Sequence, residues 1–327
     1  MGGLEKKIVK NIIVATGCTV LFLSSYLLSG CSTAQVNTSF NSGISEVPKT
    51  NLLYIENNQN LGNNVFFIPP FLTGGTASEE TTKDISEMSN EEIDALIQDK
   101  IQSKQYYKDT GYVITGFGNK IPGGIALTVD DCGASKYALD MIEKDNEVRA
   151  EMGLPPNHIT FLPIAEYYDN NKIIDVYQYA LENGHLFANH TYKHPMLRKA
   201  SNERIVSEII NSQEKFKEKF GFDMLPYMRP PGGNWDGRVC EIAKLCGIEH
   251  ILMWNRSFAD CATQADGTPV TASYCIKYIS GVKEGDLVLC HWRQNSIDAM
   301  PYFLDLLRER GLTSYTLYDY LGSENQL

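Results

Sequence analysis

The sequence predicts an α/β fold in which parallel strands and helices form a distorted (β/α)7-type barrel, preceded by a lipoprotein signal and a flexible N-terminal tether. Two observations support this fold class. From about residue 121 onward, short apolar runs alternate with helical patterns, and about seven such runs follow one another. The chain has 327 residues and 43% apolar content, enough to bury a sizeable core.

The strand-forming runs are short, as buried parallel strands usually are. They comprise residues 125–129, 159–165, 186–188, 227–228, 251–254, 287–289 and 313–317. Helical patterns separate most of them: Ile205, Ile209, Phe216 and Phe220 share one helical face, and Gly221 stands where a C-terminal cap is expected. Glycines follow three other helical stretches in the same way, at Gly184, Gly247 and Gly311.

The N-terminus has the composition of an export signal. Three lysines up to Lys10 precede an apolar run over residues 12–28, which ends in Leu28-Ser29-Gly30-Cys31. The alternative is an uncleaved membrane-spanning helix, although four Ser and Thr residues interrupt the run. The last four residues resemble the lipobox of bacterial lipoproteins, which implies a lipidated Cys31 and a membrane-anchored, extracytoplasmic protein.

Four regions are expected along the chain. Residues 1–30 form the lipoprotein signal peptide, 31–84 a tether of low structural content rich in Asn, Ser, Thr and Gly, 85–120 a helical lead-in, and 121–322 the catalytic domain. In the lead-in, Ser89-Asn90-Glu91-Glu92 has the pattern of a capping box that opens a helix.

The charge balance argues against a nucleic-acid partner. Residues 1–30 hold three Lys and one Glu, so the rest of the chain carries 26 Lys and Arg against 39 Asp and Glu, a formal charge of −13. Binding to a phosphate backbone needs a basic footprint, which this chain lacks. A neutral or amine-bearing glycan would not be repelled.

Polar residues cluster where the predicted strands end. The first run ends in Thr128-Val129-Asp130-Asp131, the third in Asn189 and the segment His190–His194, the fourth in Arg229-Pro230-Pro231-Gly232-Gly233, and the sixth in Leu289-Cys290-His291. Asp260 follows the fifth run. Each has an ordinary explanation alone, such as a turn or a cap. Because reactive residues of parallel barrels gather at the carboxyl ends of the strands, together they predict one site.

The residue types suit metal-assisted hydrolysis of an amide or ester. One carboxylate and two imidazoles are ligands for zinc or a similar divalent ion and leave a position open for water. Such an ion lowers the pKa of the water and polarises a carbonyl. A second carboxylate can act as general base, and a further histidine can protonate the leaving group.

Residues 121–321 resemble a polysaccharide deacetylase domain, the NodB homology domain of the fourth family of carbohydrate esterases, and the motifs occur in the family's order. The resemblance implies that Asp130 is the catalytic base and that Asp131, His190 and His194 bind Zn²⁺ or another divalent ion such as Co²⁺. It also implies that Arg229 holds Asp130, that His291 is the general acid, and that Asp260 orients His291.

The resemblance also suggests substrate-binding positions. A backbone N–H near Gly232 and Gly233 would face the oxyanion, Leu289 would line the acetyl-methyl pocket, and Trp254 is expected in the substrate groove. Two residues depart from the family pattern: Cys132 stands where Gly commonly follows the two Asp, and Cys261 follows Asp260 in place of Trp. The second departure bears on substrate preference more than on activity.

The expected function is removal of N-acetyl groups from an extracytoplasmic polysaccharide of N-acetylglucosamine type, such as peptidoglycan or a chitin-like glycan. Two alternatives remain open. One is an O-acetyl esterase on a glycan such as acetylated xylan, and the other is a catalytically dead glycan-binding surface lipoprotein.

Six cysteines remain after Cys18 and Cys31, which permits disulfides in an oxidising compartment. Cys261 and Cys275 bracket a polar stretch of weak periodicity, and a disulfide between them would close a loop of about fifteen residues and stabilise it by roughly 3 kcal/mol. Two free thiols are the equally weighted alternative.

Overall fold

The computed structural model describes residues 15–16, 19–20, 83–132 and 135–322. Two short antiparallel strands, β1 (Ala15–Thr16) and β2 (Thr19–Val20), belong to a compact unit of their own. Most of the predicted signal, the lipidation site Cys31 and nearly all of the tether lie outside the described residues. Among the helices that the structure describes, none is both long and apolar enough to cross a membrane.

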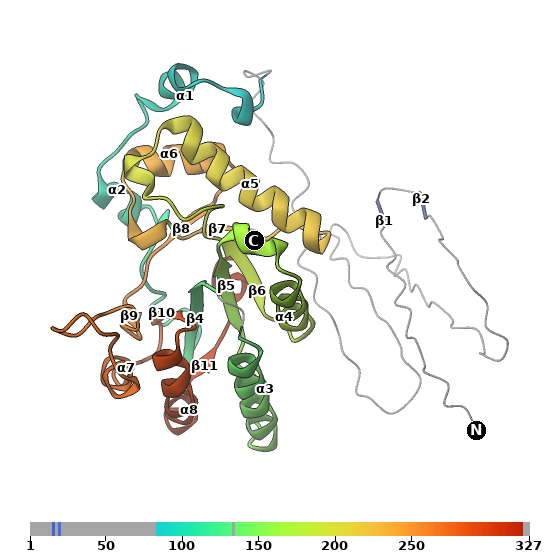
Figure 1. The fold of residues 1–327 in the computed structure, drawn as a ribbon, viewed down its shortest axis with the longest axis vertical. Helices are drawn as coiled ribbons and strands as arrows, with labels where there is room; N and C mark the ends of the chain where they lie inside the picture. The colour runs from blue at the N-terminus through green and yellow to red at the C-terminus, as the bar shows by residue number, and fades with distance from the viewer. Residues whose placement is uncertain (1–14, 17–18, 21–82, 133–134, 323–327) are drawn as a thin grey trace, which may run out of the picture. The chain divides into compact units, whose positions relative to one another are not determined.

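A nine-stranded parallel sheet forms the centre of the second unit (Figure 1). Its strand order is β3-β8-β7-β6-β5-β4-β10-β9, and β11 pairs with β4 off this path. The strands are β3 (Val113–Ile114), β4 (Gly124–Asp131), β5 (Ile159–Pro163), β6 (Leu186–Asn189), β7 (Leu225–Met228), β8 (His250–Leu252), β9 (Arg256–Ser257), β10 (Leu287–His291) and β11 (Thr313–Ser314).

The sheet curls until its two ends come close together, but it does not close into a barrel. β8 and β9 lie near opposite ends of the strand path, yet only residues 253–255 connect them, and so short a link spans at most about 14 Å. Within this link the Met253 N–H donates to Ile114 O of β3 at 2.7 Å, and the Asn255 N–H donates to Leu287 O of β10 at 3.2 Å. The predicted α/β class with a parallel sheet is confirmed, and the predicted distorted barrel is a half-barrel.

Alternation along each strand separates an outer core from an inner one. In β4, Leu127 and Val129 join the outer core, which the helices cover, whereas Ala126 belongs to the inner cluster. Thr128 and Asp130 follow Ala126 with the same period. The helix α9 (Leu317–Leu321) adds Leu317, Tyr320 and Leu321 to the inner cluster. The inside of the curl is therefore apolar near the strand starts and polar where the strands end.

Seven α-helices follow the first long strand: α3 (Lys136–Glu151), α4 (Asn171–Glu182), α5 (Asn202–Phe220), α6 (Gly237–Leu245), α7 (Ala272–Ile279), α8 (Gln294–Glu309) and α9. The predicted face of α5 is buried at Ile205, Ile209 and Phe216, and Gly221 ends the helix with a left-handed φ of 82°. The glycines predicted to end α4, α6 and α8 also have positive φ. The sequence pattern thus located these helix ends.

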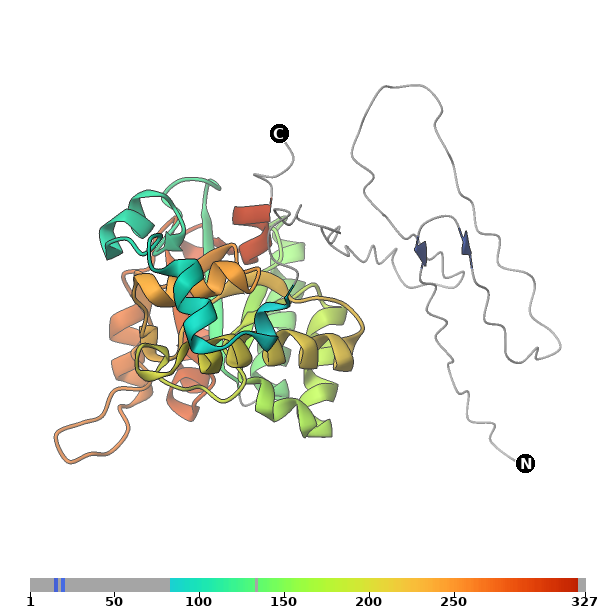
Figure 2. The ribbon, with the colours of Figure 1, turned by 90° about the horizontal axis from the view of Figure 1, so that it is seen from above.

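The segment before β3 packs onto α5 and α6 (Figure 2). It contains a short 3₁₀ turn (Ile85–Glu87), α1 (Asn90–Ile97) and α2 (Lys104–Asp109). The capping box predicted at Ser89 is present, with Ser89 Oγ and the Glu92 carboxylate each accepting from the other's backbone N–H. The buried Tyr107 hydroxyl donates to Glu241 of α6 at 2.8 Å. The helical lead-in is therefore part of the core of the second unit.

Some strand ends and one predicted disulfide differ from the structure. The predicted runs 159–165 and 251–254 end as strands at Pro163 and Leu252. The last predicted strand, 313–317, ends at Ser314, because Thr316 and Asp319 form a capping box that starts α9 at Leu317. The Cys261–Cys275 disulfide is not formed, and the six cysteines within the described residues are free thiols. Cys275 lies on the buried face of α7, whereas Cys261 is exposed and its Sγ faces His291.

Candidate metal centre and catalytic site

The polar residues predicted at the strand ends do meet at one rim of the sheet. β4 and β10 are paired in register, which sets His291 beside Asp130. The residue after β6 is His190 and the residue after β7 is Arg229, whose N–H donates to Asn189 O at 3.0 Å. Adjacent strands thereby carry the candidate residues to neighbouring positions.

Asp131, His190 and His194 form a three-residue cluster whose candidate ligand atoms lie within 4.8 Å of one another. Asp131 Oδ1 is 3.3 Å from His190 Nε2 and 3.2 Å from His194 Nε2. His190 is buried, while Asp131 and His194 are partly exposed, so the cluster has one open side. These are the three residues that the sequence predicted as metal ligands.

Left-handed backbone conformations aim these side chains. Asp131, Thr191 and His194 have φ values of 61°, 70° and 58°, which cost free energy in non-glycine residues and tend to occur at functional sites. Two side chains stabilise the loop over residues 189–194, which carries both histidines. Asn189 Oδ1 accepts from the Thr191 N–H at 2.7 Å, and Thr191 Oγ1 accepts from the His194 N–H at 3.0 Å. Local polar contacts thus stabilise a strained loop.

The strain continues into Cys132, the position where the family pattern has glycine. Its φ is 43°, its thiol donates to Val129 O, and its carbonyl accepts from the Tyr177 hydroxyl at 2.9 Å. The side chain is fully buried in the outer core. Packing and hydrogen bonds therefore hold a left-handed residue without a glycine.

The cluster fits a divalent cation. His190 Nδ1 lies 2.7 Å from Arg229 O, a carbonyl that can only accept, so Nδ1 carries the proton and Nε2 presents a lone pair to Asp131. Asp131 Oδ1 is a buried oxygen without a hydrogen-bond partner. Lone pairs that converge without a proton between them need a cation, and this donor set suits zinc and related ions.

Electrostatics also favour the charged form of Asp131. Burial acts to raise the pKa of its carboxyl group, but the adjacent imidazoles of His190 and His194 and the charge of His291 outweigh burial and place the pKa well below its usual range. The carboxylate is therefore ionised at neutral pH.

Asp130 forms a buried ion pair with Arg229. The guanidinium Nη1 donates to Asp130 Oδ1 and to Thr128 Oγ1, the latter at 2.9 Å. Nη2 donates to Met253 O at 2.9 Å, and Thr128 in turn donates to Val288 O at 2.7 Å. Asp130 Oδ2 is 3.8 Å from His190 Nε2. Arg229 thus fixes one oxygen of Asp130, and the other faces the metal cluster.

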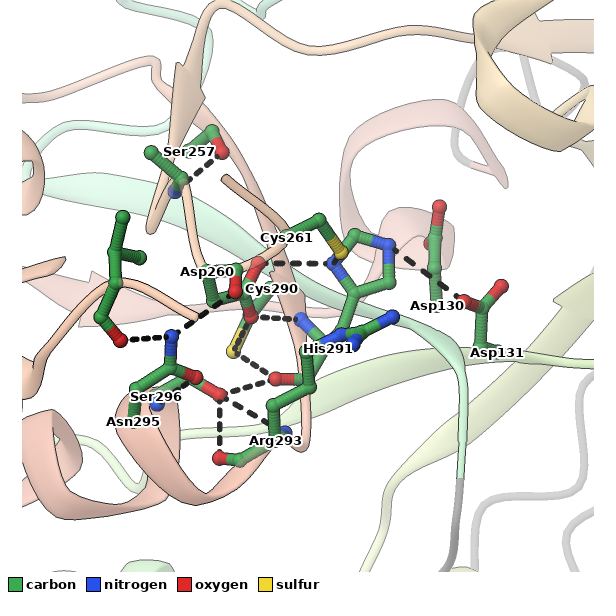
Figure 3. Close-up of polar contacts among 12 residues, drawn as sticks. Asp130, Asp131, Ser257, Asp260, Cys261, Cys290, His291, Arg293, Asn295 and Ser296 are labelled. Atoms are coloured by element: carbon green, nitrogen blue, oxygen red, sulfur yellow. Dashed lines mark hydrogen bonds and ion pairs between the residues drawn. The ribbon is translucent and has the colours of Figure 1, made fainter. Parts of the chain in front are cut away.

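The His291 ring lies between Asp260 and Asp131 (Figure 3). Its Nε2 is 4.0 Å from Asp131 Oδ2, while its Nδ1 lies 3.0 Å from Asp260 Oδ1 and 3.2 Å from Cys261 Sγ. The other oxygen of Asp260 accepts from the His291 N–H at 2.6 Å. Asp260 therefore contacts both the backbone and the ring of His291.

These neighbours favour the protonated ring. Burial acts to lower the pKa of His291, but hydrogen bonds to Asp260 and Cys261, together with the charges of Asp260 and Asp130, raise the pKa to about 10. The imidazole is therefore in its protonated, charged form at neutral pH, and its Nε2 can donate a proton toward the Asp131 cluster.

The predicted substrate-binding residues also lie at this rim. Gly232 and Gly233 have φ values of 59° and 63°, and a Cβ on Gly233 would come within 3.1 Å of the Trp254 ring. Trp254 is partly exposed and lies 5.8 Å from the Arg229 guanidinium. Leu289 is buried in β10, paired with Thr128. Gly233 therefore allows the indole to pack closely against the backbone.

Sequence reasoning missed two contributors. Asn295 in the first turn of α8 donates to Asp260 O at 3.0 Å and to Val270 O at 2.9 Å, which fixes the loop behind Asp260. Thr128 supports Arg229 as described. Neither residue type nor spacing distinguishes them from other polar residues, since their role depends on contacts between distant segments that only folding brings together.

Part of the chain is similar to known proteins. Residues 118–251 match the family model described as polysaccharide deacetylase. A peptidoglycan-N-acetylglucosamine deacetylase of Bacillus cereus is 28% identical over 219 residues, which span 65% of this chain and 94% of that protein.

Solved structures share the fold. The Bc1960 peptidoglycan N-acetylglucosamine deacetylase superposes with a TM-score of 0.55 at 21% identity, over 67% of this chain and 96% of that one. BA3943 of Bacillus anthracis, a CE4 family pseudoenzyme, superposes with a TM-score of 0.53 at 16% identity, over 64% of this chain and 69% of that one. The same fold therefore occurs with and without activity.

Proposed function

We propose that the chain is a polysaccharide deacetylase that hydrolyses N-acetyl groups of an extracytoplasmic N-acetylglucosamine polymer such as peptidoglycan or a chitin-like glycan. One observation carries the proposal: an arginine-held carboxylate, Asp130, and a carboxylate-held histidine, His291, both lie beside the candidate metal-binding cluster. This is the arrangement that amide hydrolysis requires, with a base and an acid on opposite sides of the reacting carbonyl.

Asp131, His190 and His194 would hold the divalent ion, Zn²⁺ or a similar one. When bound, the ion supplies Lewis-acid polarisation of the acetyl carbonyl and an acidified water. Asp130 would take the proton of the attacking water through Oδ2, because Arg229 occupies Oδ1. The ion pair with Arg229 keeps that carboxylate in a single orientation at a buried position.

His291 would deliver its Nε2 proton to the leaving amine, with Asp260 fixing the ring through Nδ1. A backbone N–H near Gly232 and Gly233 would stabilise the oxyanion, Leu289 would contact the acetyl methyl group, and Trp254 would contact the sugar. The amide nitrogen of N-acetylglucosamine is a poor leaving group unless protonated, which gives the raised pKa of His291 a purpose.

Acetate release from a glycan panel tests the function. We expect release from N-acetylglucosamine oligomers and peptidoglycan fragments, and loss of release after chelation. Release from acetylated xylan alone would favour an O-acetyl esterase instead. Glycan binding without acetate release, in the presence of Zn²⁺, would show a non-catalytic binding protein like the pseudoenzyme of this fold.

Asp260→Asn is expected to shift the alkaline limb of the kcat–pH profile to lower pH while keeping the metal. A general acid must be protonated, so turnover falls as pH rises through its pKa. Removing the Asp260 charge lowers the pKa of His291, by about 1–3 units for a neighbouring opposite charge. An unmoved alkaline limb in this variant would mean that His291 does not control it.

We further propose that Cys31 carries the lipid that anchors the chain outside the cytoplasm. Cys31→Ser is expected to leave the precursor uncleaved or to release the protein, since several acyl chains on one residue anchor far more firmly than one. Membrane fractionation and mass spectrometry of the N-terminus would measure this. Unchanged processing and membrane retention would contradict lipidation.

A further inference from the structure

A tight turn presents Asp260 and Cys261 together. The Ala262 N–H donates to Ala259 O at 3.1 Å, and Ala259 has a φ of 52°, so the two residues occupy the tip of a strained turn. Asn295 fixes this turn through Asp260 O. In Figure 3 both side chains face the same side of the His291 ring, opposite Asp131.

The atoms on this side form a second group with metal-ligand chemistry. Asp260, Cys261 and His291 offer a carboxylate, a thiol and an imidazole within 4.8 Å of one another, separate from the Asp131 cluster. Around tetrahedral zinc, bonds of about 2.0–2.3 Å place ligand atoms roughly 3.3–3.7 Å apart. The observed separations from Nδ1 are 3.0 Å to Asp260 and 3.2 Å to Cys261, so these two separations need to widen by only a few tenths of an ångström.

The exposure and the ligand types of these three residues determine which metal ions they can bind. Cys261 is exposed, which gives an ion access from solvent and leaves a fourth position for water. A thiolate with an imidazole selects thiophilic ions such as Zn²⁺ over hard ions such as Mg²⁺. Asp260 is almost fully buried and held by the His291 N–H, so one ligand is oriented in advance.

We propose that Asp260, Cys261 and His291 form a second, inhibitory site for a thiophilic divalent cation such as Zn²⁺. On binding, the thiol proton and the Nδ1 proton leave to solvent, and Asp260 exchanges its hydrogen bond with Nδ1 for the ion. An imidazole bound through Nδ1 holds its Nε2 proton too firmly to give it to a leaving amine. The binding step is independent of the proposed function, and the inhibitory consequence rests on it.

Ion binding is measured first, without any activity assay. Titration of the full chain with Zn²⁺ is expected to show two sites, the second weaker. His190→Ala should keep only the Cys261-dependent site, and Cys261→Ser should weaken that site at least tenfold while keeping the other. Cd²⁺ should give a thiolate charge-transfer band in the ultraviolet that Cys261→Ser loses, and Mg²⁺ should give no second site. Equal stoichiometry and equal Cd²⁺ spectra in native protein and Cys261→Ser would overturn the site.

Acetate release is then followed as Zn²⁺ is raised above one equivalent, each form normalised to its own activity at one equivalent. The native chain should lose activity with excess Zn²⁺, and Cys261→Ser should need at least tenfold more. Equal inhibition of the two forms would overturn the inhibitory role even where binding is seen. A protein that binds two ions but releases no acetate from any glycan would contradict the deacetylase function and leave the second site established.

Discussion

His190→Ala is expected to lose both the bound metal and acetate release. The ring is buried, and its orientation is fixed by Arg229 O, so the substitution removes one of the three candidate ligand atoms of the cluster. Two ligands, Asp131 and His194, cannot hold an open zinc site. Metal content at this site should fall from about one ion per chain to well below one-tenth, with acetate release falling in parallel.

His250→Ala provides the matched control. His250 is the first residue of β8, so it lies at the amino ends of the strands, whereas the site lies at their carboxyl ends. It should retain metal and activity. Metal content is read by atomic absorption after dialysis, with Cys261→Ser as background so that only the first site is counted. Full occupancy in His190→Ala would refute the assignment of His190 as a ligand.

Asp130→Asn is expected to keep the metal and lose turnover by about 10²–10⁴, the usual contribution of a general base. An amide at this position cannot accept the proton of the attacking water. It also leaves the buried Arg229 without its countercharge, so a loss of roughly 3–5 kcal/mol in stability accompanies the change.

The loss of stability needs a control of its own. Asp286 is also a buried aspartate paired with an arginine, Arg256. It lies just before β10, at the amino end of that strand, whereas the site lies at the carboxyl ends. Asp286→Asn should lower the thermal midpoint in a similar way but preserve kcat. Similar losses of kcat in both variants, measured on folded protein well below the midpoint, would show that Asp130 acts through stability and not as the base.

The meeting of the site residues could be anticipated because parallel strands order their ends. Asp130, His190, Arg229 and His291 each follow an apolar run, and a shared rim is the geometric result of parallel pairing. The face of the sheet on which Asp130 lies could be anticipated as well. Asp130 lies two residues after Thr128 and four after Ala126, so the strand period of two places it on the same inner face as Ala126.

Other features depend on contacts that no local pattern encodes. β3 and β9 are two residues long, and they exist only because the curled sheet offers them partners. The Cys261–Cys275 disulfide was wrong for a related reason. Spacing allowed the bond, but the turn after Ala259 directs Cys261 to His291, while α7 buries Cys275 in the core.

Residues 253–255 both join the two ends of the sheet and support the catalytic centre. Met253 O accepts from Arg229, and the Trp254 ring lies beside the same guanidinium. The link that joins the two ends of the half-barrel therefore also supports Arg229, which holds the proposed general base Asp130. If heat separates the two ends of the sheet, Asp130 loses its orientation before the helices unfold. Activity, measured as acetate release, should therefore fall at a lower temperature than the helical circular dichroism signal.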